Sequence, residues 1–167
     1  VKGIGFVVNV FCKPDEKVII QPPVYHPFRL TPLGNKRQVV MNPLIMNEDG
    51  SYSMDFEGLA KVADEKCRVL ILANPHNPAG IVWDVDTLRR LADFCSERGI
   101  IVISDEIHCD MAHKGFKHHP FASVSERAAQ CSITFGAPSK TFNIAGIVSS
   151  YCVVPNEELR RPFFEWL

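Results

Sequence analysis

Short apolar runs alternate with amphipathic segments along this 167-residue chain. The apolar runs are rich in β-branched and aliphatic residues and are bounded by turn-forming residues, which is typical of buried strands. They predict strands at residues 17–21, 37–41, 68–73, 100–104, 131–135 and 148–154.

The segments between these strands have helical patterns. They predict helices over residues 2–12, 55–64, 86–98 and 121–129, and a fifth that begins near Asn156. Segment 86–98 places its apolar residues on one face and stops at Gly99, while Asp55 is suited to cap the second helix. Strands that alternate with helices predict an α/β fold with a mostly parallel sheet and helices on both faces. The sequence contains no internal repeats and no interdomain linker, which indicates one domain.

Composition favours small-molecule chemistry. The chain is 46% apolar, and 18 basic and 19 acidic residues give a formal charge of −1, so no basic stripe indicates a nucleic acid or a membrane surface as partner. The apolar runs are shorter than the roughly 18 residues of a membrane span. No signal peptide is visible, and the six cysteines occur singly without C-x-x-C pairs. We therefore expect free thiols and a cytoplasmic location.

Three predicted strands run directly into clusters of polar residues. Strand 68–73 leads into NPHNPAG (74–80), strand 100–104 into DEIHCDM (105–111) and strand 131–135 into GAPSKTFN (136–143). Because ligands of open α/β sheets bind beyond the carboxyl ends of the strands, we expect these clusters to share one edge.

An acid, an amide and a lysine at one sheet edge suit an aromatic aldehyde cofactor with a basic ring nitrogen. A lysine with a lowered pKa can form a Schiff base with an aldehyde, which is the role expected of Lys140. Asp105 would keep the ring nitrogen protonated, and Asn77 would donate to the phenolic oxygen. Taken singly, the same residues also suit a helix cap, a rigid turn and a lysine that reaches solvent.

Four ordered motifs carry a family resemblance: VIIQPPVYHPF (18–28), NPHNPAGIVW (74–83), SDEIHCDM (104–111) and SKTFNIAG (139–146). Together they resemble the fold-type I pyridoxal-phosphate enzymes of the class I/II aminotransferase group. The branch they resemble most contains the bacterial cystathionine β-lyases and cysteine C–S lyases.

The resemblance implies roles for individual residues. Lys140 looks like the Schiff-base lysine, Asp105 like the partner of the pyridinium nitrogen, and Asn77 like the residue that contacts the phenolic oxygen. Tyr25 stands where the family places a ring stacked on the cofactor, although a packed loop aromatic is the alternative. His108 occupies a position where many aminotransferases have a tyrosine near the same oxygen.

Two departures from the family pattern concern the cofactor phosphate. Ala137 stands where a phosphate-binding serine is frequent, and Val148 stands where aminotransferases commonly carry an arginine. Ser139, or a residue outside the chain, would then contribute to phosphate binding. The family's phosphate-binding helix start would lie at or just before residue 1.

The resemblance also implies a larger protein. Residues 1–167 are expected to form the central part of the pyridoxal-phosphate-binding large domain of a homodimeric enzyme, with the N-terminal arm and C-terminal small domain outside the chain. The expected activity is C–S β-elimination on an amino acid such as cystathionine or cysteine, giving pyruvate, ammonia and a thiol. An aminotransferase is the alternative, and a non-catalytic binding protein that retains the fold is a second one.

A histidine-rich segment, HCDMAHKGFKHH (108–119), raises the alternative of a metal site. The segment has no recognised ligand spacing, so we predict no metal and expect His118 and His119 to face solvent. A Ser139–Lys140 hydrolase dyad is a further alternative, but the chain has no G-x-S-x-G motif to accompany it.

Overall fold

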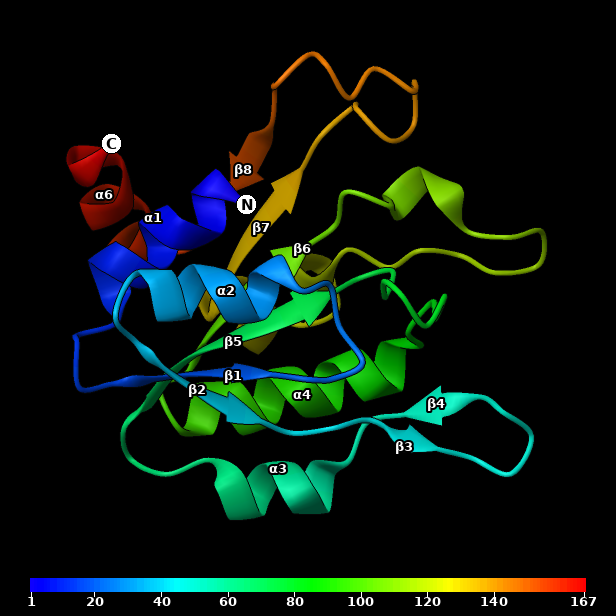
Figure 1. Ribbon diagram of the computed structural model, residues 1–167, viewed down its shortest axis with the longest axis horizontal. Coiled ribbons are helices and arrows are strands. Elements are labelled where there is room, and N and C mark those ends of the chain that lie inside the picture. The colour runs from blue at the N-terminus through cyan, green and yellow to red at the C-terminus, as the bar shows by residue number, and fades with distance from the viewer.

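The computed structural model describes residues 1–167, which form a six-stranded central sheet with the order β2-β1-β5-β6-β7-β8 (Figure 1). Neighbouring strands are parallel except β7 and β8, which pair antiparallel at one edge. The strands are β1 (Lys17–Ile20), β2 (Gln38–Met41), β5 (Cys67–Ala73), β6 (Ile101–Asp105), β7 (Ser132–Gly136) and β8 (Tyr151–Val153). A separate antiparallel pair consists of β3 (Ile45–Met46) and β4 (Tyr52–Ser53).

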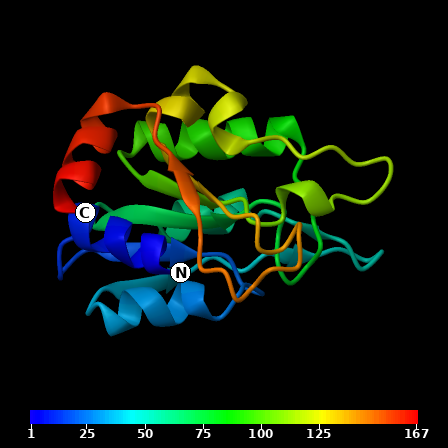
Figure 2. The same ribbon diagram turned by 90° about the horizontal axis from the view of Figure 1, so that it is seen from above.

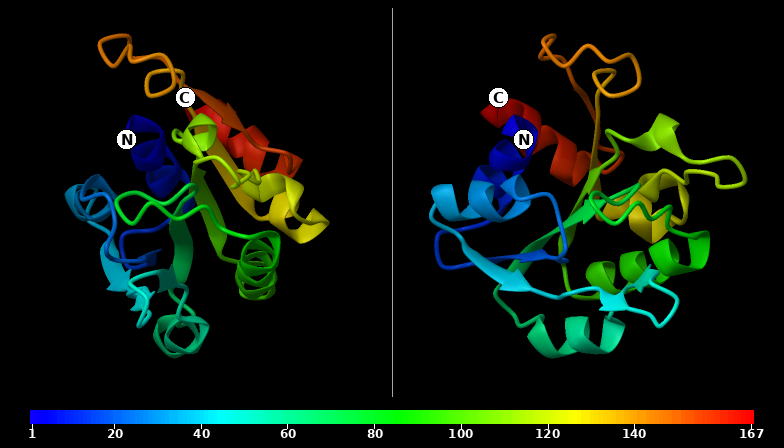
Figure 3. Two further views of the ribbon diagram at one scale, coloured as in Figure 1. Left: turned by 90° about the vertical axis from the view of Figure 1, so that its right-hand side faces the viewer. Right: turned by 45° about the vertical axis from the view of Figure 1, so that its right-hand side comes forward.

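Helices cover both faces of the sheet, which lies between two helical layers in Figures 2 and 3. One layer contains α1 (Lys2–Phe11), α2 (Pro27–Gly34) and α6 (Glu157–Trp166). The other contains α3 (Phe56–Val62), α4 (Val85–Glu97) and α5 (Glu126–Gln130). Two short 3₁₀ helices, η1 (Cys109–Met111) and η2 (Phe121–Ser123), lie in the connection between β6 and α5.

Each layer of helices has its own apolar core, because side chains of a strand point alternately to the two faces of the sheet. In the central strand β5, Val69 and Ile71 pack with α1 and α2, whereas Leu70 and Leu72 pack with α3 and α4. A strand that is buried on both faces must be apolar throughout, which explains the uninterrupted VLIL run.

Local signals account for the helix boundaries. Asp55 and Asp84 cap α3 and α4 by accepting hydrogen bonds from backbone N–H groups inside the first turn. Helix α4 ends at Glu97, and Gly99 follows with a φ of +64°, a left-handed conformation that glycine adopts readily.

The predicted fold class and the six main strands are confirmed, and the differences have physical causes. The predicted helix 121–129 is interrupted, because Ser125 has an extended backbone and caps a new helix, α5, through the N–H of Ala128. The predicted strand 148–154 is shorter in the structure, where β8 covers only Tyr151–Val153. Helix α2 was not predicted; Pro27 at its first turn and Pro32 inside it obscure the helical pattern.

All six cysteines are free thiols. Cys12, Cys67, Cys95 and Cys131 are buried, whereas Cys109 and Cys152 are half-buried. No helix has both the length and the apolar composition that crossing a bilayer requires.

Candidate active site

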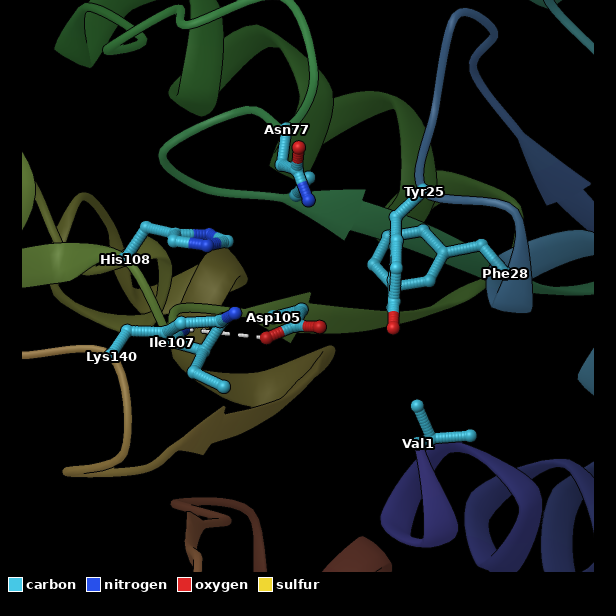
Figure 4. A pocket seen from close by; sticks show the side chains of 9 residues that line it. Val1, Tyr25, Phe28, Asn77, Asp105, Ile107, His108 and Lys140 are labelled. Carbon is cyan, nitrogen blue, oxygen red and sulfur yellow. Dashed lines mark hydrogen bonds between the residues drawn. The ribbon is translucent and has the colours of Figure 1, made fainter. Parts of the chain in front are cut away.

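The carboxyl ends of β5, β6 and β7 lie side by side at one edge of the sheet. Ala73 pairs with Asp105, and Asp105 pairs with Phe135, so the loops that follow these strands begin at the same level. Between them is a cavity of about 150 Å³ (Figure 4). Its lining consists of Val1, Tyr25, Phe28, Ala73, Asn77, Asp105, Ile107, His108 and Lys140.

Asp105, the last residue of β6, lies at the centre of this group. The backbone N–H of Ile107 donates to its Oδ1 at 3.3 Å, the dashed line in Figure 4, while Oδ2 has no partner within the chain. Burial raises the pKa of Asp105, because a carboxylate loses hydration in the cavity. The free oxygen is thus an acceptor prepared for a donor on a ligand, preferably a positively charged one.

Lys140 enters the same space from the turns that follow β7. Its side chain extends toward Asp105 in Figure 4, and no carboxylate lies within salt-bridge distance of its Nζ. The amine is therefore not committed to a structural ion pair. A ligand in the cavity would meet both the amine and the acid.

His108 lies beside Lys140, three residues after Asp105. Burial lowers the pKa of His108 and the charge of Lys140 lowers it further, while the carboxylate of Asp105 has the opposite effect. The net result favours a neutral imidazole, which offers one donor and one acceptor to a ligand.

Asn77 projects into the cavity from the loop after β5, where its side-chain amide makes no hydrogen bond within the chain. Backbone contacts hold this loop: His76 N–H donates to Ile81 O at 2.7 Å, and Gly80 N–H donates to His76 O at 2.9 Å. The indole N–H of Trp83 also donates to Ala73 O at 3.0 Å, so the base of the loop is fixed to the strand end. The Asn77 amide is positioned by these contacts and stays free for a ligand.

Tyr25 closes the opposite side of the cavity, in the segment between β1 and α2. Its ring contacts buried Phe28 edge to face, with centroids 6.1 Å apart and an interplanar angle of 78°. The side chain is 39% exposed, so one part of the ring packs on the protein and the rest is available to a flat ligand.

The structure brings together five of the six residues singled out from the sequence. The sixth, Ser139, instead lines an adjoining cavity of about 770 Å³, which also reaches Asp105 and Ile107. The sequence did not single out Phe28, Ala73 or Ile107 as lining residues. Apolar residues with no polar chemistry of their own leave no such signal.

Comparison with known proteins identifies the family of the chain. The family model described as aminotransferase class I and II matches residues 2–163. The chain belongs to the class I and II aminotransferase family.

Individual proteins are also similar to the chain. Cystathionine β-lyase PatB of Bacillus subtilis is 44% identical over 164 residues, which is 98% of the chain. The crystal structure of cystalysin from Treponema denticola, which contains pyridoxal 5'-phosphate, superposes with a TM-score of 0.93 at 37% identity over 98% of the chain. A kynurenine–oxoglutarate transaminase of Dictyostelium discoideum is 36% identical over 107 residues, covering 63% of the chain and 24% of that protein.

The chain spans 42% of the length of PatB and 42% of the cystalysin chain. In those two proteins, more than half of the polypeptide therefore lies outside the region that matches this chain.

The expectation that His118 and His119 face solvent is wrong for His118, and His119 is half-buried. His118 does not face solvent: its side chain is only 10% exposed, and its Nε2 lies 2.9 Å from Oε2 of Glu106. Glu106, directly after Asp105, is 4% exposed and was not recognised from the sequence as a structural residue. The pairing joins residues 12 apart through the path of a loop, which local sequence patterns do not reveal.

Proposed function

We propose that this chain is the pyridoxal-phosphate-binding core of an enzyme that catalyses C–S β-elimination on an amino acid, releasing pyruvate, ammonia and a thiol. The convergence of Asp105, Asn77, Lys140 and Tyr25 on one cavity carries the proposal. The similarity to a cystathionine β-lyase and to cystalysin, each over 98% of the chain, supports it.

The residues of the cavity fit the cofactor. The unpartnered Oδ2 of Asp105, which faces the cavity, would accept the N–H of the protonated ring nitrogen. The free amide of Asn77 would donate to the phenolic oxygen, with His108 as a second polar group nearby. The exposed part of the Tyr25 ring would stack on the heterocycle.

When bound, pyridoxal phosphate supplies an electron-accepting ring that stabilises negative charge at the α-carbon of an attached amino acid. Lys140 would hold the resting cofactor through Nζ and, once displaced by substrate, would remove the proton from the α-carbon. Asp105 would keep the proton on the ring nitrogen and so maintain the ring as an electron acceptor.

The phosphate would lie near the start of α1. Val1 lines both cavities, and the first backbone N–H groups of this ten-residue helix have no helical acceptor, which makes them donors for an anion. Ser139 lines the adjoining cavity, as Val1 does, and would add a hydroxyl donor.

An aminotransferase is the second candidate, because the transaminase similarity covers part of the chain and both reactions begin with removal of the same proton. The lyase is favoured because cystathionine β-lyase PatB is 44% identical over 98% of the chain, whereas the kynurenine–oxoglutarate transaminase is 36% identical over 63% of it. A putative aminotransferase of Clostridium difficile is 41% identical over 98% of the chain, so the assay of the reaction, and not the extent of similarity, decides between the two. We further propose that residues 1–167 are the central part of the large domain of a homodimer. The six free thiols support a reducing, cytoplasmic location.

The assignment is tested on the complete polypeptide. Pyridoxal phosphate is added, the adduct is reduced with borohydride, and the modified peptide is mapped; modification is expected at Lys140 and is expected to disappear in Lys140→Ala. Lys114→Ala, which removes an exposed lysine of a neighbouring loop, is the control and should keep the modification. If no adduct forms, the proposal is refuted and the protein is instead a non-catalytic binding protein that retains the fold.

The reaction class is tested by supplying cystathionine or cysteine. Pyruvate formed without a keto-acid acceptor supports the lyase. Turnover that depends on an added keto acid supports the aminotransferase instead.

A further inference from the structure

Glu106 points to the face of the sheet opposite the cavity. Side chains alternate along the end of β6, so that Asp105 faces the cavity while Ser104 and Glu106 face the side of α4 and α5. Glu106 is 4% exposed, and a buried carboxylate is costly unless its oxygens are satisfied.

Three hydrogen bonds satisfy this carboxylate. Oε1 accepts from the hydroxyl of Ser104 and from the backbone N–H of Phe121, both at 2.8 Å, and Oε2 lies 2.9 Å from Nε2 of His118. His118 Nδ1 is buried without a partner, so the arrangement that costs least places the ring proton on Nε2, donating to Glu106.

These contacts bring the two ends of a loop together. His118 and Phe121 return to the residue from which the loop departs, so the segment 107–117 is held at both ends. A further contact, Asn74 Nδ2 donating to His119 O at 2.9 Å, joins the returning end to the loop that carries Asn77.

The closed segment carries groups that line the cavity. Ile107 N–H holds the carboxylate of Asp105, and His108 lines the cavity directly. Further along, Asp110 accepts a hydrogen bond from the hydroxyl of Thr141 at 2.8 Å, and Thr141 is the neighbour of Lys140. The segment therefore supplies the imidazole of His108 and contacts both Asp105 and the turn that bears Lys140.

We propose that the hydrogen bond between Glu106 and His118 is a positioning contact for the active site. From the far face of the sheet it anchors both ends of segment 107–117, and so orients His108 and the Ile107 N–H that holds the Asp105 carboxylate. Neither residue touches the cavity itself. The consequence for cofactor binding depends on the proposed function, whereas the ordering of the segment does not.

Hydrogen exchange of the complete, cofactor-free protein tests the contact. His118→Leu removes the donor and leaves a buried carboxylate oxygen unpaired, so the amides of residues 107–111 should exchange on the order of tenfold faster. His118→Gln, whose side-chain amide can donate to Glu106, should restore most of the protection. His113→Leu alters an exposed histidine of the same segment and should change nothing.

Amide hydrogen exchange in α4 distinguishes a local effect on segment 107–117 from a general loss of stability. Acceleration confined to the segment supports the proposal, whereas unchanged exchange at 107–111, or equal acceleration in α4, would overturn it. If His118→Leu does not fold, His118→Phe is measured, because its ring keeps much of the imidazole volume but offers no N–H to Glu106. Several-fold acceleration at residues 107–111 is expected, and wild-type exchange would overturn the proposal.

Cofactor binding provides the second readout. His118→Leu should weaken pyridoxal phosphate binding several-fold relative to His113→Leu, and equal binding would remove the link between the contact and the site. Failure of the wild-type protein to form an adduct at Lys140 would refute the proposed function alone, because the exchange result is obtained without cofactor.

Discussion

Replacing Asp105 with asparagine should make the protein more stable and less active at the same time. The substitution keeps the side-chain volume, and the asparagine carbonyl can still accept from the N–H of Ile107. It removes the negative charge that faces the cavity. A change that merely disturbed the fold would lower both properties.

The expected stability change follows from burial, which raises the pKa of Asp105. A carboxyl group with a raised pKa favours the folded state while it is protonated, and this contribution is lost as the pH rises through the raised pKa. Asp105→Asn should therefore match the wild-type stability in acid and exceed it at neutral pH. The comparison is made by urea unfolding of the cofactor-free protein.

The expected loss of cofactor affinity and turnover follows from Oδ2, the one oxygen of Asp105 that has no partner within the chain. Asp105 can offer one charge-assisted hydrogen bond through Oδ2. In the variant the asparagine oxygen accepts from Ile107, so an amide NH2 takes the place of Oδ2 and cannot accept from the ring N–H. Loss of this bond should cost about 1.5 to 3 kcal/mol, or roughly ten- to a hundredfold in Kd for pyridoxal phosphate. Turnover should fall further, by about 10² to 10³, because the ring nitrogen loses the charge that keeps it protonated.

Titration of cofactor binding and pyruvate release from cysteine measure these effects. Wild-type turnover in Asp105→Asn would refute the role of the carboxylate. A variant that is less stable than wild type at neutral pH would refute the argument from burial.

Three further substitutions probe the surroundings of the site. Trp83→Phe leaves the carbonyl of Ala73 without its donor, so urea unfolding should show a loss of about 1 to 3 kcal/mol, together with weaker cofactor binding at the adjacent loop. Thr141→Val removes an exposed hydrogen bond to Asp110; stability should change by less than about 0.5 kcal/mol, and a several-fold slower reaction of the neighbouring lysine with pyridoxal phosphate is expected by stopped flow. Leu91→Ala, at a fully buried position of α4, should cost about 2 to 5 kcal/mol by the same unfolding assay while the folded fraction keeps its cofactor affinity.

The sequence was informative where the signal is local. Strand β5 was predicted within one residue because its apolar run is uninterrupted, and α4 because an amphipathic stripe ends at Gly99. The pairings Ala73↔Asp105 and Asp105↔Phe135 place the ends of β5, β6 and β7 together, as the rule for parallel strands predicts.

Elements with mixed signals were missed. Helix α2 contains two prolines, and the short strands β3 and β4 have only two residues each, too few for a periodic pattern. The placement of Ser139 was also not predicted. Ser139 immediately precedes Lys140, but the two side chains line different cavities, because the turn after β7 directs consecutive side chains to different sides.

By itself, the sequence of this protein determined the layered α/β class and the strands that end in an acid, an amide and a lysine, because burial imposes its pattern on contiguous residues. Only the tertiary structure decided the strand order β2-β1-β5-β6-β7-β8, and with it which loops share the cavity. It also decided that His118 turns inward to Glu106. Such a contact depends on the path of a whole loop, and the free energy that selects the path comes from partners distant in sequence.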